Sequence, residues 1–191
     1  MNKKLLFTVT LIISLGLFGC AKFFEKEPIS EEGAMTQTEL RAFFPNQTVS
    51  AGDTVYAPFN PKAIKRLDDK FAETLFDLGL TAKWRVGFDC NHFAALKMAV
   101  GQVMFVTDTF HKWKSSESVA IGEFWYVPRG NKPVLQVGEN GEKTYLLTGH
   151  AINVVIVREN DKFVRKFLDI YSGKYMNLSE TEIASAYLIK F

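Results

Sequence analysis

The stretch 88–97 reads Phe88-Asp89-Cys90-Asn91-His92-Phe93-Ala94-Ala95-Leu96-Lys97. Asp89 is a residue type that caps helix N-termini, and the residues after Cys90 are apolar on nearly every side through Val100. This pattern predicts a buried helix that begins near Cys90. Because backbone N–H groups and the dipole at a helix start favour a thiolate, Cys90 is a candidate reactive residue.

A second helix is predicted upstream, over residues 61–78. Asn60 suits the N-cap, Pro61 suits the first helical position, and Gly79 suits the residue just past the end. The apolar residues of this segment recur at spacings of three or four, which places them on one face. These residues are Ile64, Leu67, Phe71, Leu75 and Leu78. Capping-box patterns at 36–39 and 179–182 predict two further short helices.

Beyond Ser116 the pattern becomes that of β-strands, rich in β-branched and aromatic residues. Asn140-Gly141 and Glu159-Asn160-Asp161 are turn signals between them. The expected strands cover 119–127, 134–138, 142–147, 150–157 and 163–171. Helices followed by a run of antiparallel strands predict an α+β fold, with N-terminal helices packed on an antiparallel β-sheet.

His150 and Asp169 are expected to meet on one face of a β-hairpin. If the turn is Glu159-Asn160, His150 lies opposite Asp169. If the turn is Asn160-Asp161, His150 faces Tyr171 and Asp169 is its diagonal neighbour. Side chains alternate with period two, so either register puts the two Cβ atoms within ~4.5–8 Å. A three-residue turn would separate the pair.

Three segments together resemble the bacterial transglutaminase-like cysteine proteinases, a family of the papain-like fold. The segments are Phe88-Asp89-Cys90-Asn91-His92-Phe93-Ala94-Ala95-Leu96-Lys97, Gly149-His150-Ala151-Ile152-Asn153-Val154-Val155 and Phe167-Leu168-Asp169. The resemblance implies a papain-like domain in which Cys90 is the nucleophile, His150 the base and Asp169 the carboxylate that orients the base. It spans roughly residues 85–172.

The chain departs from the family pattern around the nucleophile. Asn91-His92 replaces an acidic pair, and no glutamine shortly precedes Cys90 to act as an oxyanion donor. The backbone N–H of Cys90 and the indole N–H of Trp84 are the candidate substitutes. A rival hypothesis places zinc on Cys90, His92 and His150, but one sulfur and two nitrogens without paired spacing match structural zinc sites poorly. We therefore expect neither a metal nor a cofactor.

The first residues have the parts of an export signal. Lys3 and Lys4 precede an uncharged apolar stretch, Leu5 to Phe18, that is short for a membrane span. Leu17-Phe18-Gly19-Cys20 resembles the bacterial lipobox, in which the cysteine sulfur is lipidated and becomes the N-terminus. We expect a signal peptide at 1–19, a polar tether at 20–38 and one papain-like domain at 39–191. Ala21 resembles the pattern of outer-membrane lipoproteins, which would face the periplasm in a Gram-negative cell.

Charge and cysteine content limit the expected partners. Cleavage after residue 19 would remove two of the 23 basic residues and none of the 21 acidic ones, so the remaining formal charge is zero. A chain with zero net charge has no overall positive electrostatic potential that would attract nucleic acid. With Cys20 lipidated, Cys90 is the only thiol left, so no disulfide can form within the chain. A membrane reached through lipid on Cys20 is the first expected partner.

Two functions follow from these features. In the first, a membrane-anchored thiol hydrolase or acyltransferase cleaves a peptide or isopeptide amide in a protein or cell-wall peptide through Cys90, His150 and Asp169. Such a protein would be a lipoprotein that carries palmitate and acts as a thiol protease or related hydrolase. In the alternative, a non-catalytic papain-like lipoprotein binds a partner at the membrane surface, since a fold does not fix a function.

Overall fold

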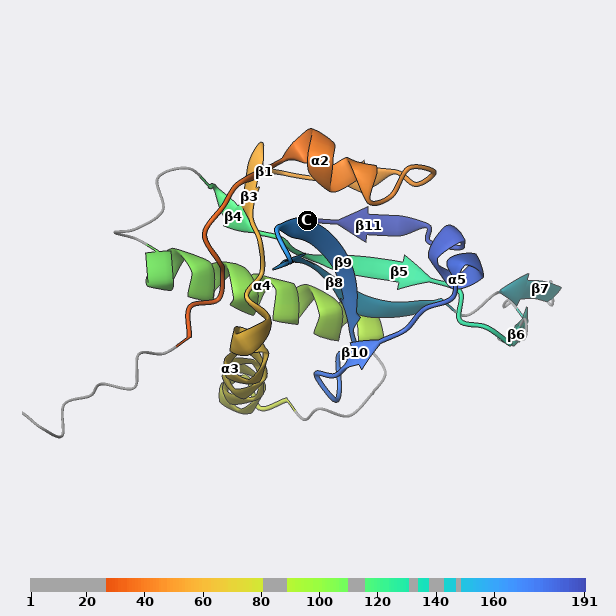
Figure 1. Ribbon diagram of the computed structural model, residues 1–191. Helices are drawn as coiled ribbons and strands as arrows, with labels where there is room; N and C mark the ends of the chain where they lie inside the picture. Colours follow the sequence, from red (N-terminus) through yellow and green to blue (C-terminus); the bar gives the residue numbers. More distant parts are fainter. Residues whose placement is uncertain (1–26, 81–88, 110–115, 131–133, 138–142, 147–148) are drawn as a thin grey trace, which may run out of the picture.

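The centre of the molecule is a six-stranded β-sheet, seen in a computed structural model that describes residues 27–80, 89–109, 116–130, 134–137, 143–146 and 149–191 (Figure 1). Across the sheet its strands are β10 (Tyr175–Met176), β9 (Lys162–Leu168), β8 (His150–Glu159), β5 (Ile121–Tyr126), β11 (Leu188–Lys190) and β2 (Val49–Ser50). Neighbouring strands are antiparallel except β11 and β2, which are parallel.

Smaller sheets flank this one. The first contains β1 (Met35–Thr36), β3 (Val55–Ala57) and β4 (Ser118–Val119), in that order. The second is the antiparallel pair β6 (Val134–Val137) and β7 (Lys143–Leu146), which confirms the predicted hairpin strands. Their predicted turn, Asn140-Gly141, lies outside the described residues.

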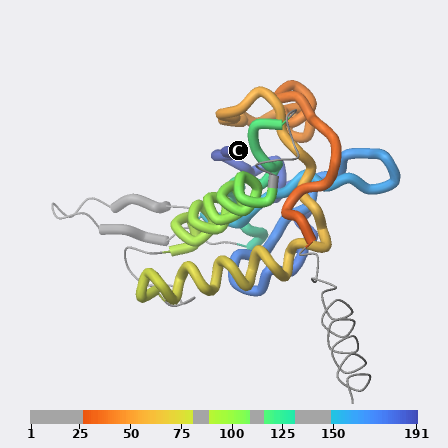
Figure 2. The backbone as a smooth tube through the Cα atoms, turned by 90° about the vertical axis from the view of Figure 1, so that its left-hand side faces the viewer, coloured from red at the N-terminus to blue at the C-terminus, as the bar shows by residue number. Residues whose placement is uncertain are grey.

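The helices are α2 (Gln37–Ala42), a 3₁₀ turn (Pro61–Ala63), α3 (Ile64–Asp77), α4 (Cys90–Thr109) and α5 (Glu180–Ala184). The long helices α3 and α4 contact each other, and α4 packs along β5 and β8 (Figures 1 and 2). α4 begins at Cys90 as predicted. Both capping boxes are present, with Thr36 and Ser179 as the N-cap residues.

Most of the predicted apolar stripe of α3 faces the core, and Leu67, Phe71 and Leu75 are buried. Leu78, also predicted to belong to the stripe, is the C-cap residue and is exposed. The first turn is 3₁₀ rather than α-helical. Asn60 caps it, because its side-chain oxygen accepts a hydrogen bond from the backbone N–H of Lys62 at 3.0 Å. Gly79 follows the helix with a φ of +65°, a conformation that glycine adopts without strain.

Strand β8 is buried on both faces, which explains its apolar run from Ala151 to Val157, interrupted only by Asn153. The buried Asn153 amide donates to the backbone oxygens of Ala94 and Gly122. One face packs against the α3 and α4 side through Ala151, Val155 and Val157. The opposite face packs against the α2 and α5 side through Ile152, Val154 and Ile156. A strand covered on both sides has no need of alternating polar residues.

The β8–β9 turn is Asn160-Asp161, one of the two predicted possibilities. Glu159 pairs with Lys162, and the two central residues have φ values of 49° and 61°. Two positive φ angles in a two-residue hairpin match the strand twist, and Asn and Asp tolerate them. The turn therefore selects the second register, but the ladder ends where Asn153 pairs with Leu168. The predicted strand 163–171 is too long, since Asp169 and Tyr171 lie in the turn after β9.

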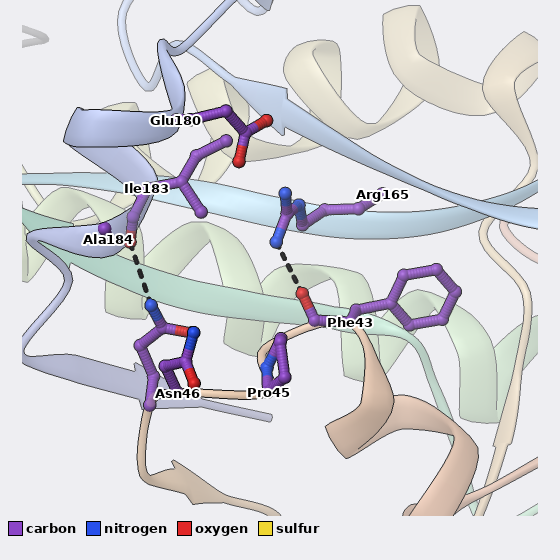
Figure 3. A pocket seen from close by; sticks show the side chains of 8 residues that line it. Phe43, Pro45, Asn46, Arg165, Glu180, Ile183 and Ala184 are labelled. Carbon is purple, nitrogen blue, oxygen red and sulfur yellow. Dashed lines mark hydrogen bonds between the residues drawn. The ribbon is translucent and has the colours of Figure 1, made fainter.

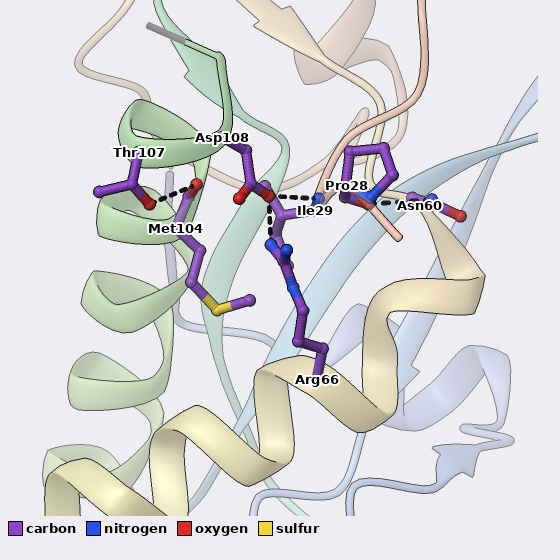
Figure 4. A network of polar contacts seen from close by, with 7 residues as sticks. All are labelled: Pro28, Ile29, Asn60, Arg66, Met104, Thr107 and Asp108. Carbon is purple, nitrogen blue, oxygen red and sulfur yellow. Dashed lines mark hydrogen bonds and ion pairs between the residues drawn. The ribbon is translucent and has the colours of Figure 1, made fainter. Parts of the chain in front are cut away.

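The start of the described chain is fixed to both long helices (Figure 4). Asp108 of α4 accepts a hydrogen bond from the backbone N–H of Ile29 at 3.0 Å and forms an ion pair with Arg66 of α3. Asn60 donates to the backbone oxygen of Pro28 at 2.9 Å. The fold thus includes residues that precede Met35.

These contacts correct the predicted domain boundary and element order. Residues 28–38, predicted to be tether, belong to the fold because Ile29 and Met35 are buried in its core. The helices do not form an N-terminal block, since β1, β2 and β3 precede α3 and β2 pairs with β11 near the C-terminus. The predicted signal peptide, Cys20 and Trp84 lie outside the described residues. None of the helices in the described ranges is long and apolar enough to cross a membrane.

Candidate functional site

Cys90 is the first residue of α4 and is partly buried against the core between α3 and α4. The helix start is closed by a backbone bond from Phe93 N–H to Asp89 O at 3.0 Å. The Asp89 carboxylate lies 2.9 Å from His92 Nδ1, across the first turn of the helix. The thiol therefore lies at a helix N-terminus whose orientation is fixed by local contacts.

His150 begins β8 and pairs with Tyr126 of β5, and their rings meet edge to face with centroids 6.0 Å apart. Burial lowers the pKa of His150 below its usual value, and the charge of Asp169 opposes that shift only in part. The neutral imidazole is therefore favoured near neutral pH. A neutral ring has one nitrogen that donates a hydrogen bond and one that accepts.

Asp169 follows β9 where the chain leaves the sheet. Its carboxylate accepts hydrogen bonds from the backbone N–H groups of Tyr171, at 3.1 Å, and Ser172, at 2.6 Å. Burial alone would raise the pKa of Asp169, but these hydrogen bonds and the charge of His150 lower it overall. The structure thus brings Asp169 within electrostatic reach of His150, while the hydrogen bonds described for its carboxylate close a turn.

Two half-exposed tyrosines lie near the start of α4 and the start of β8. Tyr171 is 45% exposed and meets Phe93 edge to face at 5.5 Å, and Tyr187 is 57% exposed and lies against Gly149. Burial raises the pKa of each hydroxyl, and a negative charge on Cys90 raises both further. We call Cys90, His150, Asp169, Tyr171 and Tyr187 the Cys90 surface.

Tyr187 lies directly over the backbone that leads into β8. A Cβ at Gly149 would be only 1.8 Å from the Tyr187 hydroxyl oxygen, so glycine is required for this approach. The ring also meets Trp125 edge to face at 6.2 Å, and the indole N–H of Trp125 donates to Glu123 at 3.1 Å. Packing therefore fixes this tyrosine although much of its surface is exposed.

Sequence reasoning missed Tyr187, which lies on the C-terminal side of α5, far along the chain from Cys90. Tyr171 appeared in one predicted register as the residue opposite His150, but the structure places it in the turn after β9. The catalytic roles predicted for Cys90, His150 and Asp169 are not tested by these contacts.

The alternative zinc site is not assembled. Within the described ranges, which include Cys90, His92 and His150, no group of three potential ligands is arranged to hold a metal ion. His92 instead contacts Asp89 on its own helix turn.

A cavity of about 230 Å³ lies between β9, α5 and the segment after α2 (Figure 3). Arg165 points into it from β9, with its guanidinium 5.2 Å from the ring of Phe44 and 5.3 Å from that of Phe167. The same group donates a hydrogen bond to the backbone oxygen of Phe43. Arg165 therefore joins β9 to the segment after α2, a structural role.

Comparison with known proteins gives a likeness of fold. No family model matches the chain, and no curated protein matches it. Among solved structures, a PSL1a–E64 complex matches with a TM-score of 0.54 and 18% identity, over 83% of this chain and 51% of that chain. A Polyporus squamosus lectin bound to the human-type influenza-binding epitope Neu5Aca2-6Galb1-4GlcNAc matches with a TM-score of 0.56 and 18% identity, over 83% of this chain and 49% of that one.

These matches correct the predicted family. The assignment to transglutaminase-like cysteine proteinases and their papain-like fold does not stand, because no family model supports it and a matching structure is named as a lectin. The predicted function as a thiol hydrolase, thiol protease or acyltransferase is contradicted with it. The chain spans about half the length of the solved chains it matches, and at 18% identity the likeness shows the fold alone.

Proposed function

We propose that this chain is a non-catalytic binding protein and that the Cys90 surface is its carbohydrate-binding site. The observation that carries the proposal is the pair of half-exposed rings, Tyr171 and Tyr187. Tyr171 meets Phe93, in the first turn of α4, edge to face at 5.5 Å, and Tyr187 lies over Gly149, next to His150. Binding sites typically combine aromatic surface with a few fixed polar groups. Tyrosine supplies both an apolar face and a hydroxyl.

Carbohydrate is the ligand class that these groups suit best. A sugar presents apolar C–H faces to aromatic rings and hydroxyl groups that donate and accept hydrogen bonds. The neutral His150 ring can do both, and Asp169 can accept. A solved structure that shares the fold is named as a lectin bound to Neu5Aca2-6Galb1-4GlcNAc, which supports testing glycans first.

Cys90, His150 and Asp169 are proposed here as residues that contact the ligand. We further propose that lipid on Cys20 holds the domain at a membrane surface, the outer membrane in a Gram-negative cell. A cell-wall glycan would then be within reach of the site.

The test is a glycan-binding measurement on the wild type and three tyrosine variants. The panel includes Neu5Aca2-6Galb1-4GlcNAc and purified cell-wall glycan strands. Tyr171→Ala and Tyr187→Ala should each weaken binding at least about tenfold, which is ~1.4 kcal/mol. Tyr175→Ala is the matched control, because Tyr175 is 43% exposed but lies on β10. Failure of every glycan to bind, or equal loss in the control, would contradict the proposal.

A second measurement asks whether the thiol lies in the ligand site. E64 is the compound named with one matching structure. Incubation of the wild type with E64, followed by intact-mass and thermal-shift measurements, should show binding that Cys90→Ala abolishes and that bound glycan reduces. E64 binding that survives in Cys90→Ala, or that glycan does not affect, would place the thiol outside the site.

A further inference from the structure

A buried ion pair lies beneath the loop that carries Asp169 and Tyr171. Lys97 of α4 is only 1% exposed, and its Nζ is 2.5 Å from Oδ1 of Asp68 on α3. The contact is ionic, since the ammonium approaches the carboxylate without the alignment of a hydrogen bond. Burying a lysine is costly, and a buried ion pair often stabilises a fold no better than apolar residues of the same volume. The Lys97–Asp68 pair can instead serve to position the neighbouring loop.

The carboxylate of Asp68 lies directly against the loop. At Gly173 a Cβ would be 1.8 Å from Asp68 Oδ2, and Gly173 has a φ of +65°. A side chain at this position would therefore be excluded by both the contact and the backbone conformation. Lys97 of α4 thus contacts Asp68 of α3, and Asp68 in turn contacts the loop at Gly173.

The loop itself is a closed turn that leads from β9 to β10. The backbone N–H of Asp169 donates to Lys174 O at 2.9 Å, and that of Gly173 donates to Asp169 O at 3.0 Å. The Asp169 carboxylate accepts from the N–H groups of Tyr171 and Ser172 inside the turn. These bonds are internal to the turn, so its order also depends on the contacts that support it from outside.

A series of aromatic contacts connects Lys97 to Tyr171 of the proposed ligand site. Lys97 Nζ lies 5.4 Å from the centroid of the Phe71 ring. Phe71 meets Phe93 edge to face at 6.3 Å, and Phe93 meets Tyr171 edge to face at 5.5 Å. A cavity of about 280 Å³, lined by Lys97, Tyr171 and Ser172 among others, adjoins this contact line. Packing around the loop is incomplete there, which increases its dependence on the ion pair.

We infer that the Lys97–Asp68 pair is a positioning device for the Cys90 surface, which holds the loop 169–173 against α3 and α4 so that Tyr171 and Asp169 face the ligand. The inference rests on the proposed carbohydrate-binding function for its biological role. Lys97 and Asp68 act through the loop and do not touch the ligand.

The test replaces both charges with apolar side chains of similar size, in Asp68→Leu/Lys97→Met. A purely structural pair would leave a variant that is as stable as the wild type and binds glycan as well. Positioning predicts a folded variant that binds glycan at least tenfold more weakly and whose Tyr171 and Ser172 amides exchange with deuterium at least tenfold faster. The matched control is Lys65→Gln/Asp69→Asn, which removes an exposed ion pair from α3 and should change neither measurement.

Gly173→Ala supplies an independent variant in which the ion pair keeps both charges but the loop must shift. Gly173→Ala should show the same loss of glycan affinity and the same faster amide exchange. If the double variant fails to fold, these two measurements on Gly173→Ala test the inference. Wild-type affinity and wild-type exchange in either folded variant would overturn the inference. If the wild type binds no glycan, the proposed function fails, whereas the exchange rates still test the positioning.

Discussion

The imidazole of His150 is the group on the Cys90 surface whose charge responds to its surroundings near neutral pH. Its burial at the start of β8 favours the neutral ring, and Asp169 favours the charged one. Burial prevails, because the Asp169 carboxylate also accepts two backbone hydrogen bonds from its own turn. A neutral ring avoids the cost of desolvating a cation when a ligand covers it.

The pKa of His150 can be measured by NMR titration of the ring protons. We expect a value below 6.5 in the folded protein, because burial is the larger influence. Asp169→Asn should lower it further, since the substitution removes the charge that opposes burial. A value above 6.5, or an increase in Asp169→Asn, would contradict this account of the site.

Individual site residues differed in how far the sequence could predict them. Cys90 at the start of α4 was predictable because helix capping is local in sequence. The hairpin argument for His150 and Asp169 was only partly right, because β9 ends at Leu168 and Asp169 lies in the turn that follows, within electrostatic reach of His150. Tyr187 was not predictable, since its contact with Gly149 joins positions distant in sequence and leaves no periodic pattern.

Helix α3 packs on the core through one apolar face, formed by Leu67, Phe71 and Leu75. Leu67 is fully buried and packs with residues of α4 and the sheet, so Leu67→Ala should create a cavity that costs about 2–5 kcal/mol of unfolding free energy. Urea unfolding measures the loss. The control is Phe76→Ala, because Phe76 is 82% exposed on the same helix and should change stability little. Equal effects of the two substitutions would mean that the helix faces the other way.

Helix α5 is held by its capping box. The Ser179 hydroxyl, the backbone N–H of Arg129 and the backbone N–H of Ser179 donate to the Glu182 carboxylate and lower its pKa to about 2. A lowered carboxyl pKa stabilises the fold above the unfolded value, near 4.5, and that contribution is lost as the pH falls from 4.5 towards 2.

Glu182→Gln should therefore reduce stability at pH 6 and flatten the loss of stability on acidification across this window. Ser179→Ala should cost about 0.5–2 kcal/mol at pH 6, as other N-cap losses do. Urea midpoints at several pH values check both variants. A Glu182→Gln protein with the acid sensitivity of the wild type would show that the carboxylate is not the group that responds.

The long-range arrangement of the molecule was beyond what the sequence could predict. Local patterns located α3, α4 and the β8–β9 hairpin, and turn chemistry left two registers open until the φ angles at Asn160 and Asp161 selected one. The parallel pairing of β2 with β11 joins two very short strands from opposite ends of the chain, and such pairing has no local signal. Ile29 and Met35 lie among polar residues in the sequence, so the sequence did not indicate that they are buried. The predicted start of the fold was therefore too late.

Attachment to a membrane remains a prediction that depends on Cys20. Cells grown with labelled palmitate should incorporate label into the wild-type product, and Cys20→Ser should abolish both the label and membrane retention. The acyl chains contribute ~0.8 kcal/mol for each buried methylene, so their loss should release the protein. Cys20→Ser protein that stays in the membrane as an integral species would contradict the predicted anchor.

The most direct test of the central claim is an NMR titration of the isotope-labelled protein with a glycan that it binds. We expect the largest amide shifts at His150, Tyr171 and Tyr187, with Cys90 at the edge of the affected region and no response around Arg165, which lines the separate cavity beside α5. Shifts concentrated around Arg165, or the absence of shifts at all three Cys90-surface residues while the glycan is bound, would contradict the claim that this surface is the ligand site.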